Sequence, residues 1–98
     1  MLFRSDLEVD TARHCATVEG RTIELTPKEF ELLAFLVKNP GILFTRQQLL
    51  EMVWGYDFAG DTRTVDVHMR WLREKIEADP SNPKRILTIR GLGYKLEG

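Results

Sequence analysis

Residues 61–78 read DTRTVDVHMRWLREKIEA, and this stretch decides the fold. No glycine or proline occurs between Arg63 and Ala78, so a helix can span this stretch, with Asp61 or Thr62 as its cap. At about 100° per residue, several apolar side chains fall on one side of such a helix. They are Val65, Met69, Leu72 and Ile76. The spacing therefore predicts a helix that packs one apolar stripe into a core.

The opposite side of this helix carries a different mixture of side chains. It holds Arg63, Val67, Arg70, Trp71 and Glu74, with Arg73 and Lys75 on the flanks. An ordinary solvated helix face would hold charges of both signs and no aromatic residue. Arginines suit the phosphates and guanine edges of a DNA major groove, and apolar groups suit thymine methyls. The mixture favours a nucleic-acid recognition face; the alternative is that Val67 and Trp71 pack on a neighbouring loop.

Two further helices are predicted upstream. Thr26 and Glu29 can form a capping box around Pro27, and the residues before Pro40 end that helix. A second helix begins at Thr45, again with a capping box, and its apolar residues are Leu49, Leu50, Val53 and Trp54. The link over residues 40–44 is short enough for a helix-turn-helix. We expect the apolar residues of both helices to lie in the core.

Short strands are predicted on both sides of the helices. Apolar and polar residues alternate along residues 2–25, where Glu19-Gly20 provides a turn and the strands suit a small antiparallel sheet. Residues 84–96 return to strand character. Strands at both ends of a helical middle indicate an α+β fold, and 98 residues fit one domain, residues 1–98.

The C-terminal segment has the pattern of a hairpin. Residues 85–90 and 94–96 are its two strands, and Gly91-Leu92-Gly93 is its turn, where two glycines allow positive φ. Arg90 then lies near the tip, from which a guanidinium could enter a narrow minor groove. The alternative is a plain hairpin with an exposed arginine.

Charge is distributed unevenly along a chain whose net charge is only −1. Residues 1–61 hold six Lys and Arg against ten Asp and Glu, whereas residues 62–96 hold eight against four. Phosphates respond to the local field, so the basic C-terminal third can bind DNA on a nearly neutral protein. Chance segregation of solvated charge is the alternative.

Several functional classes are excluded. Cys15 is alone, which rules out a disulfide within the chain and suits a cytoplasmic protein, and no apolar run approaches the ~20 residues of a membrane span. His14 and His68 lack a nucleophile constellation, and no second ligand pair exists for zinc. We therefore expect no enzyme activity, no metal and no cofactor. The remaining competitor of DNA binding is a winged-helix module for protein contact, such as with RNA polymerase, that binds DNA weakly.

Four blocks of residues together resemble a known family, in order and at its spacing across essentially the whole chain. The family is the effector domain of the OmpR/PhoB-type response regulators. The blocks are Thr26-Pro27-x-Glu29-Phe30-x-Leu32-Leu33, Arg46-x-x-Leu49-Leu50-x-x-Val53-Trp54, Arg63-Thr64-Val65-Asp66-Val67-His68-x-x-x-Leu72-Arg73-x-Lys75 and Thr88-x-Arg90-Gly91-x-Gly93-Tyr94.

The resemblance implies a winged helix-turn-helix with an N-terminal antiparallel four-stranded sheet, three helices and a C-terminal β-hairpin wing. It also implies sequence-specific binding of double-stranded promoter DNA, with the recognition helix in the major groove and the wing in the minor groove. Head-to-tail dimers would form on tandem direct repeats. We expect the free domain to be a monomer, because so short a chain has little apolar surface left once its core is filled.

Roles for individual residues follow from the same resemblance. Phosphates would be held by Arg63, His68 and Arg70; bases would be approached by Thr64, Val67 and Arg73; the wing would act through Thr88 and Arg90. Trp71 departs from the family, because well-known members carry a base-reading arginine there. It could touch a thymine methyl or a sugar, or lie along the backbone.

The loop over residues 55–61 resembles the family's transactivation loop, which meets RNA polymerase. Its candidate contacts are Tyr56, Asp57 and Phe58. Large aromatic residues suit a contact surface, and equally they could fold back onto the core. Full-length relatives carry an N-terminal receiver domain that is phosphorylated by a sensor histidine kinase. This chain has no such domain, and is expected to be the output half of a two-component regulator.

Overall fold

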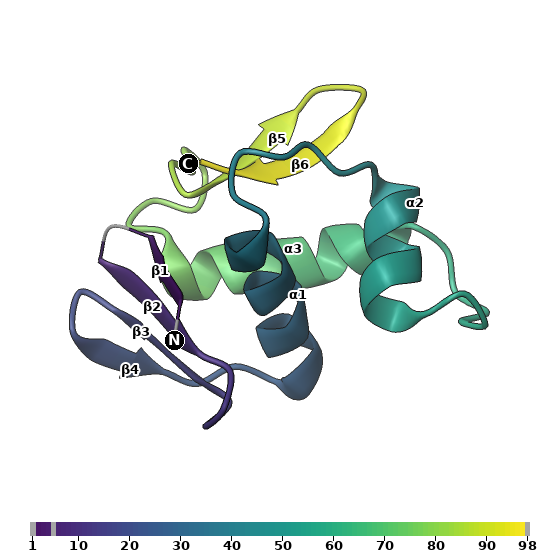
Figure 1. The fold of residues 1–98 in the computed structure, drawn as a ribbon. Helices are drawn as coiled ribbons and strands as arrows, with labels where there is room; N and C mark the ends of the chain where they lie inside the picture. The colour runs from purple at the N-terminus through teal and green to yellow at the C-terminus, as the bar shows by residue number, and fades with distance from the viewer. Residues whose placement is uncertain (1, 5, 98) are drawn as a thin grey trace.

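The computed structural model describes residues 2–4 and 6–97. Its N-terminal part is an antiparallel sheet (Figure 1). Its strands β1 (Leu2–Arg4), β2 (Leu7–Asp10), β3 (Cys15–Val18) and β4 (Arg21–Ile23) pair in sequence order. Alternation turns the apolar residues of β2 and β3 inward. Glu19 and Gly20 both have positive φ, 52° and 79°, as a tight two-residue hairpin turn requires. The predicted four-stranded sheet is confirmed.

Helix α1 (Pro27–Lys38) crosses the inner face of the sheet and supplies much of the core. Its capping box is formed as predicted: the Glu29 N–H donates to Thr26 Oγ1 at 3.3 Å, and the Thr26 N–H donates to Glu29 Oε1 at 2.9 Å. The helix ends at Asn39, whose side-chain amide donates to the Phe35 carbonyl at 2.8 Å. The predicted bounds of this helix are confirmed.

The second helix changes its hydrogen-bond pattern part-way along. It begins as α2 (Arg46–Leu49) behind the Thr45 capping box and continues as a π-helical turn, η1 (Leu50–Trp54). The Gly55 N–H closes this turn on the Leu50 carbonyl, five residues back, at 3.1 Å. Single π turns often occur at functional sites. Here η1 ends at Trp54, whose ring meets α3.

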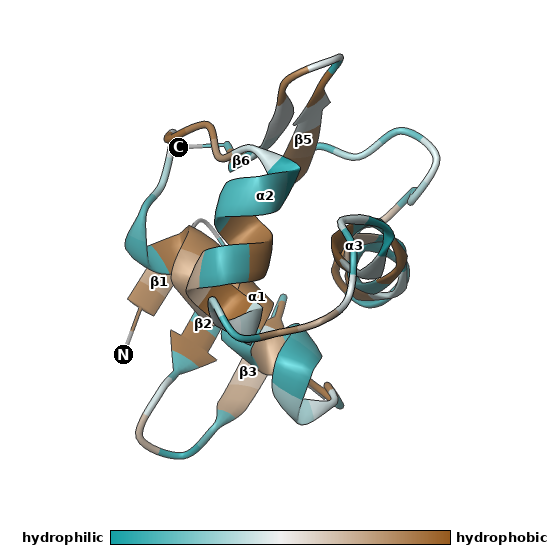
Figure 2. Ribbon diagram, turned by 90° about the vertical axis from the view of Figure 1, so that its right-hand side faces the viewer, coloured by the Kyte–Doolittle hydropathy of each residue, from teal (hydrophilic) through white to brown (hydrophobic). Residues whose placement is uncertain are grey.

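Helix α3 (Arg63–Ile76) lies beside α1 and is amphipathic (Figure 2). The predicted stripe is confirmed, because its four apolar residues are at most 2% exposed. Thr62 is the N-cap residue but makes no side-chain capping bond; the Asp61 carboxylate accepts the Arg63 N–H instead, at 2.9 Å. Extension to Ala78 is wrong: the chain leaves the helix at Glu77, whose carboxylate accepts the N–H groups of residues 84–86 at 2.9–3.1 Å.

The C-terminal hairpin consists of β5 (Ile86–Ile89) and β6 (Gly93–Leu96). The link between α1 and α2 runs along β6 (Figure 1), where Phe44 and Tyr94 exchange two backbone hydrogen bonds of 2.9 Å. Gly91 has the positive φ expected, 75°, but Gly93 does not. A Cβ at Gly93 would lie 2.0 Å from the Phe44 carbonyl oxygen, so this glycine allows close approach of two backbones. The α+β winged-helix architecture is confirmed.

Candidate nucleic-acid interface

The outer face of α3 is exposed where the sequence predicts it. Val67 is 42% and Trp71 is 45% exposed, and Arg63, Arg70 and Glu74 are exposed around them. Neither apolar side chain is buried under a loop. A continuous surface of arginine and apolar groups therefore lies opposite the buried stripe. This surface is called the outer face of α3 below.

The arginines on the outer face are held only by weak pairs. Arg63 Nη2 lies 3.0 Å from Asp61 Oδ2, and Arg70 Nε lies 3.6 Å from Glu74 Oε1. The hydrogen bonds from Arg63 hold the pKa of the Asp61 carboxyl below its ordinary value. All four side chains are more than half exposed, and exposed pairs of this kind contribute little to stability. The guanidinium groups can therefore exchange a carboxylate for a phosphate at little cost.

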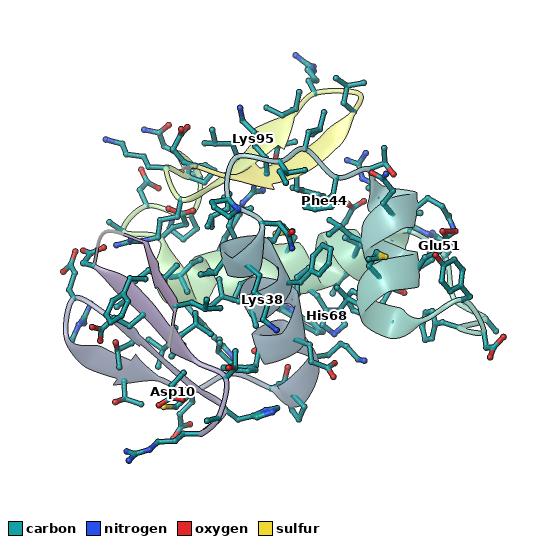
Figure 3. The ribbon with its side chains drawn as sticks, in the orientation of Figure 1. Asp10, Lys38, Phe44, Glu51, His68 and Lys95 are labelled. Carbon is teal, nitrogen blue, oxygen red and sulfur yellow. The ribbon has the colours of Figure 1, made fainter. Side chains whose placement is uncertain are left out.

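His68, labelled in Figure 3, has its ring between those of two tryptophans. Its ring centroid is 4.9 Å from that of Trp54 and 5.1 Å from that of Trp71, edge-on in both cases. Its Nδ1 is 2.9 Å from the Thr64 carbonyl oxygen. That oxygen can only accept, so Nδ1 carries the proton and Nε2 is the atom left for other contacts. A phosphate contact through Nε2 requires the doubly protonated ring.

The two aromatic residues of the loop over residues 55–61 differ in their surroundings. Tyr56 is 79% exposed and points away from the core. Phe58 turns back, with its ring centroid 6.4 Å from that of Trp54, although 40% of it remains exposed. Asp57 between them is exposed. Tyr56 is therefore accessible for a contact, whereas Phe58 is partly folded back toward Trp54; whether the loop contacts a partner stays a prediction.

Arg73 and Thr88, expected respectively at a base and at the wing's DNA contact, lie against each other. Arg73 Nη2 donates to Thr88 Oγ1 at 2.7 Å and to the Ile86 carbonyl at 2.8 Å. Its guanidinium carbon is 5.3 Å from the centre of the Tyr94 ring, and burial lowers the pKa of this arginine. In the structure Arg73 is therefore directed at the wing. Arg90 is exposed in the turn between β5 and β6.

Lys75 does not extend the basic surface as its sequence position suggests. Its Nζ lies 2.6 Å from Oε1 of Glu29, a residue that is 1% exposed. Burial disfavours the charged Glu29 carboxylate, but Lys75 and the Thr26 hydrogen bonds hold its pKa below the ordinary value. Lys75 therefore ties α3 to the start of α1 instead of serving the outer face.

One further network was not predicted from the sequence. Asp66 Oδ1 accepts from Arg46 Nε and from the Tyr94 hydroxyl, both at 2.7 Å. Burial, together with Asp66, raises the pKa of Tyr94. The network joins α2, α3 and β6, and so fixes the two helices and the wing relative to one another. All three residues occur in the motif blocks, which was the only signal available for them.

Comparison with known proteins decides the family. Residues 20–96 match the family model described as "Transcriptional regulatory protein, C terminal". The chain belongs to this family. It is a DNA-binding effector domain of the OmpR/PhoB type, and it is not an enzyme. Among residues 2–4 and 6–97, no helix is long and apolar enough to span a bilayer.

Curated relatives are similar over nearly all of this chain. The sensory transduction protein RegX3 of Mycobacterium tuberculosis is 55% identical over 92 residues, which are 94% of this chain and 40% of that protein. The DNA-binding response regulator MtrA of Mycolicibacterium smegmatis is 52% identical over 95 residues, 97% of this chain and 42% of that protein. The chain thus spans less than half the length of these relatives.

Solved structures of similar proteins show the same fold. Response regulator DrrB of Thermotoga maritima, an OmpR/PhoB homologue, superposes with a TM-score of 0.90 at 39% identity, over 99% of this chain and 44% of that one. The RstA DNA-binding domain of Klebsiella pneumoniae, in complex with the RstA box, gives 0.88 at 28% identity, over 98% of this chain and 95% of that one.

Proposed function

We propose that the outer face of α3 enters the major groove of a promoter, with the β5–β6 wing in the adjacent minor groove. The observation that carries this is the outer face itself, where exposed arginines surround two exposed apolar side chains. The arginines are paired only with exposed carboxylates, so phosphates can replace those partners. The solved complex of the similar RstA domain with its DNA box supports the same use of the fold.

Individual contacts follow from position on this surface. We propose that Arg63, Arg70 and a doubly protonated His68 bind phosphates, which fix register without reading sequence. Bases are met by Val67 and Trp71, with Thr64 beside them, through thymine methyls and groove edges. Thr88 and Arg90 serve the wing, where Arg90 is exposed at the tip. Arg73 is tied to β5, which points to a different role for it.

Partners beyond DNA are part of the same proposal. We propose that the loop over residues 55–61 contacts RNA polymerase, because Tyr56 is largely exposed there and Asp57 is exposed beside it. Copies would bind tandem direct repeats head to tail and be monomeric when free. Since the relatives are more than twice as long, we propose that the complete regulator also carries a receiver domain, which a sensor histidine kinase phosphorylates. We propose a cytoplasmic location, because promoter DNA is the partner.

A salt titration with matched arginine variants tests the DNA proposal. Arg70 and Arg13 have side chains 82% and 83% exposed, and each has a weak carboxylate partner, at 3.6 and 3.9 Å. Arg70 lies on the outer face, whereas Arg13 follows β2 at the far end of the sheet. Affinity for a duplex selected from random DNA is measured by fluorescence anisotropy across a salt series.

The wild type should lose affinity by orders of magnitude as salt rises, because phosphate binding releases counterions. Arg70→Ala should weaken selected and unrelated duplexes alike and reduce the slope of log affinity against log salt by about 1. Arg13→Ala should leave the slope unchanged. A flat salt response in the wild type, or equal effects of the two variants, would contradict the proposal and favour a protein-contact module.

A further inference from the structure

We propose that Arg73 is a positioning residue that fixes the wing against α3, instead of reading a base. The inference rests on the proposed function, in which α3 and the wing occupy neighbouring grooves. It assigns to Arg73 a role in setting how those two elements reach the DNA together.

Within the described residues, the side-chain hydrogen bonds of Arg73 go to the wing. Its Nη2 bridges two acceptors on β5, the Ile86 carbonyl and the Thr88 hydroxyl, at 2.8 and 2.7 Å. Its guanidinium also lies over the ring of Tyr94, which belongs to β6. A single side chain of α3 therefore holds both strands of the hairpin.

The side chain of Arg73 is turned toward the wing, where Nη2 makes its two hydrogen bonds. Within the described part of the chain, Arg73 Nε is buried and has no hydrogen-bond partner. A residue free to reach a base would direct its donors to solvent, as the exposed Arg70 does. Turning Arg73 outward would break both bonds to β5 and leave the Tyr94 ring uncovered on that side.

Besides the contacts of Arg73 with β5, the wing is attached to the helices through Tyr94 of β6. Tyr94 donates to Asp66 on α3 at 2.7 Å, and Arg46 of α2 lies 5.5 Å from the Tyr94 ring centre. This attachment holds β6 only. β5 is held at its start, where Ile86 is buried and its N–H donates to Glu77 at 2.9 Å. Beyond that point, the bond from Arg73 to Thr88 limits rotation of the outer part of the hairpin away from α3.

The rotation matters because of where Thr88 lies. Arg90, the proposed minor-groove residue, is two positions beyond Thr88 along the chain. Rotation of the outer part of the hairpin therefore moves Arg90 relative to the outer face of α3. Loss of Arg73 should leave the major-groove contacts in place and make the position of Arg90 in the minor groove less well defined.

Three variants separate this role from base reading and from general stabilisation. Arg73→Met removes the donors and keeps an unbranched stem, and Thr88→Val removes one acceptor. Lys75→Met is the matched control: Lys75 also lies on α3, and its Nζ makes a charge-assisted contact with Glu29 Oε1 of α1 at 2.6 Å. Lys75 therefore joins α3 to α1 and not to the wing.

Hydrogen exchange of the free domain tests the attachment without DNA. Arg73→Met should speed exchange of the amides of residues 86–96 by about 10- to 100-fold relative to those of α1, the range expected for loss of a charge-assisted hydrogen bond. Lys75→Met should instead speed exchange of the α1 amides and should not speed exchange of the wing amides relative to them. Unchanged wing exchange in Arg73→Met would overturn the inference.

Selection of binding sites from random DNA tests the consequence. Arg73→Met and Thr88→Val should both flatten the A·T preference beside the major-groove site and keep the base preferences within it. Loss of preference at one major-groove base pair in Arg73→Met alone would show base reading and overturn the inference. A wild type without any sequence preference would contradict the proposed function, while faster wing exchange in Arg73→Met would still support the attachment.

Discussion

Replacement of Trp71 tests whether the outer face of α3 has been correctly oriented. Trp71 is 45% exposed and meets His68 edge-on at 5.1 Å. A tryptophan side chain presents roughly 200 Å², so about 110 Å² is removed from water. At about 25 cal/mol per Å² this corresponds to ~3 kcal/mol as an upper bound. Compactness of the unfolded chain and the ~0.5 kcal/mol helix preference of alanine reduce it. We expect Trp71→Ala to lower the free energy of unfolding by about 1–2 kcal/mol.

Leu72 provides the control, because it is the next residue and is fully buried. Leu72→Ala should cost about 2–5 kcal/mol, as large-to-small core substitutions do. Urea unfolding of both variants should be followed by circular dichroism, since Trp71→Ala removes one of the two fluorophores. Equal costs above ~3 kcal/mol for the two variants would show that Trp71 is a core residue.

The same position should also govern sequence preference. Trp71→Arg introduces a side chain that pairs with guanine O6 and N7, so binding-site selection should show a new preference at one base pair. DNA should also change the fluorescence of Trp71 in a Trp54→Phe background. If selection returns the wild-type sequence for Trp71→Arg and the fluorescence does not respond, then the outer face has been assigned to the wrong side of α3.

Three other expectations follow from single contacts. The folded-state pKa of Glu29 is lowered, so this carboxylate contributes stability above its ordinary pKa of ~4.3 that is lost as pH falls through the lower folded value. Urea unfolding against pH should show this, and a Glu29→Gln variant that keeps the same acid-side loss would refute it. Gly93→Ala should lower the free energy of unfolding by about 1–3 kcal/mol, because the new Cβ clashes with the Phe44 carbonyl oxygen. Thermal unfolding measures this, and a variant as stable as the wild type would refute it. Sedimentation of the free domain should give a monomer; a tight dimer without DNA would count against assembly on tandem sites.

Local patterns in the sequence were sufficient for most of the fold. The apolar stripe of α3 and both capping boxes depend on residues within one or two helical turns, and all are found as predicted. The end of α3 was not predictable in this way. It is set by Glu77, whose carboxylate binds N–H groups seven to nine residues later.

The candidate site was predicted less completely, because several of its charged residues have distant partners. Helical periodicity places Arg73 and Lys75 on the flanks of the outer face. Arg73 instead binds β5, 13 and 15 residues away, and Lys75 binds Glu29, 46 residues away. Periodicity gives the direction of a side chain from its own helix but not which neighbouring element it meets. The role of Gly93 was missed for the same reason, since Phe44 is far from it in sequence.

The measurement that tests the central claim most directly is an NMR titration of the 15N-labelled domain with its selected duplex. Binding through the outer face of α3 and the wing should shift the amides of Val67, Arg70 and Arg90 and the indole N–H of Trp71. The amides of β2 and β3 should stay in place. Shifts confined to the sheet or to residues 55–61, with Trp71 and Arg90 unchanged, would contradict the account.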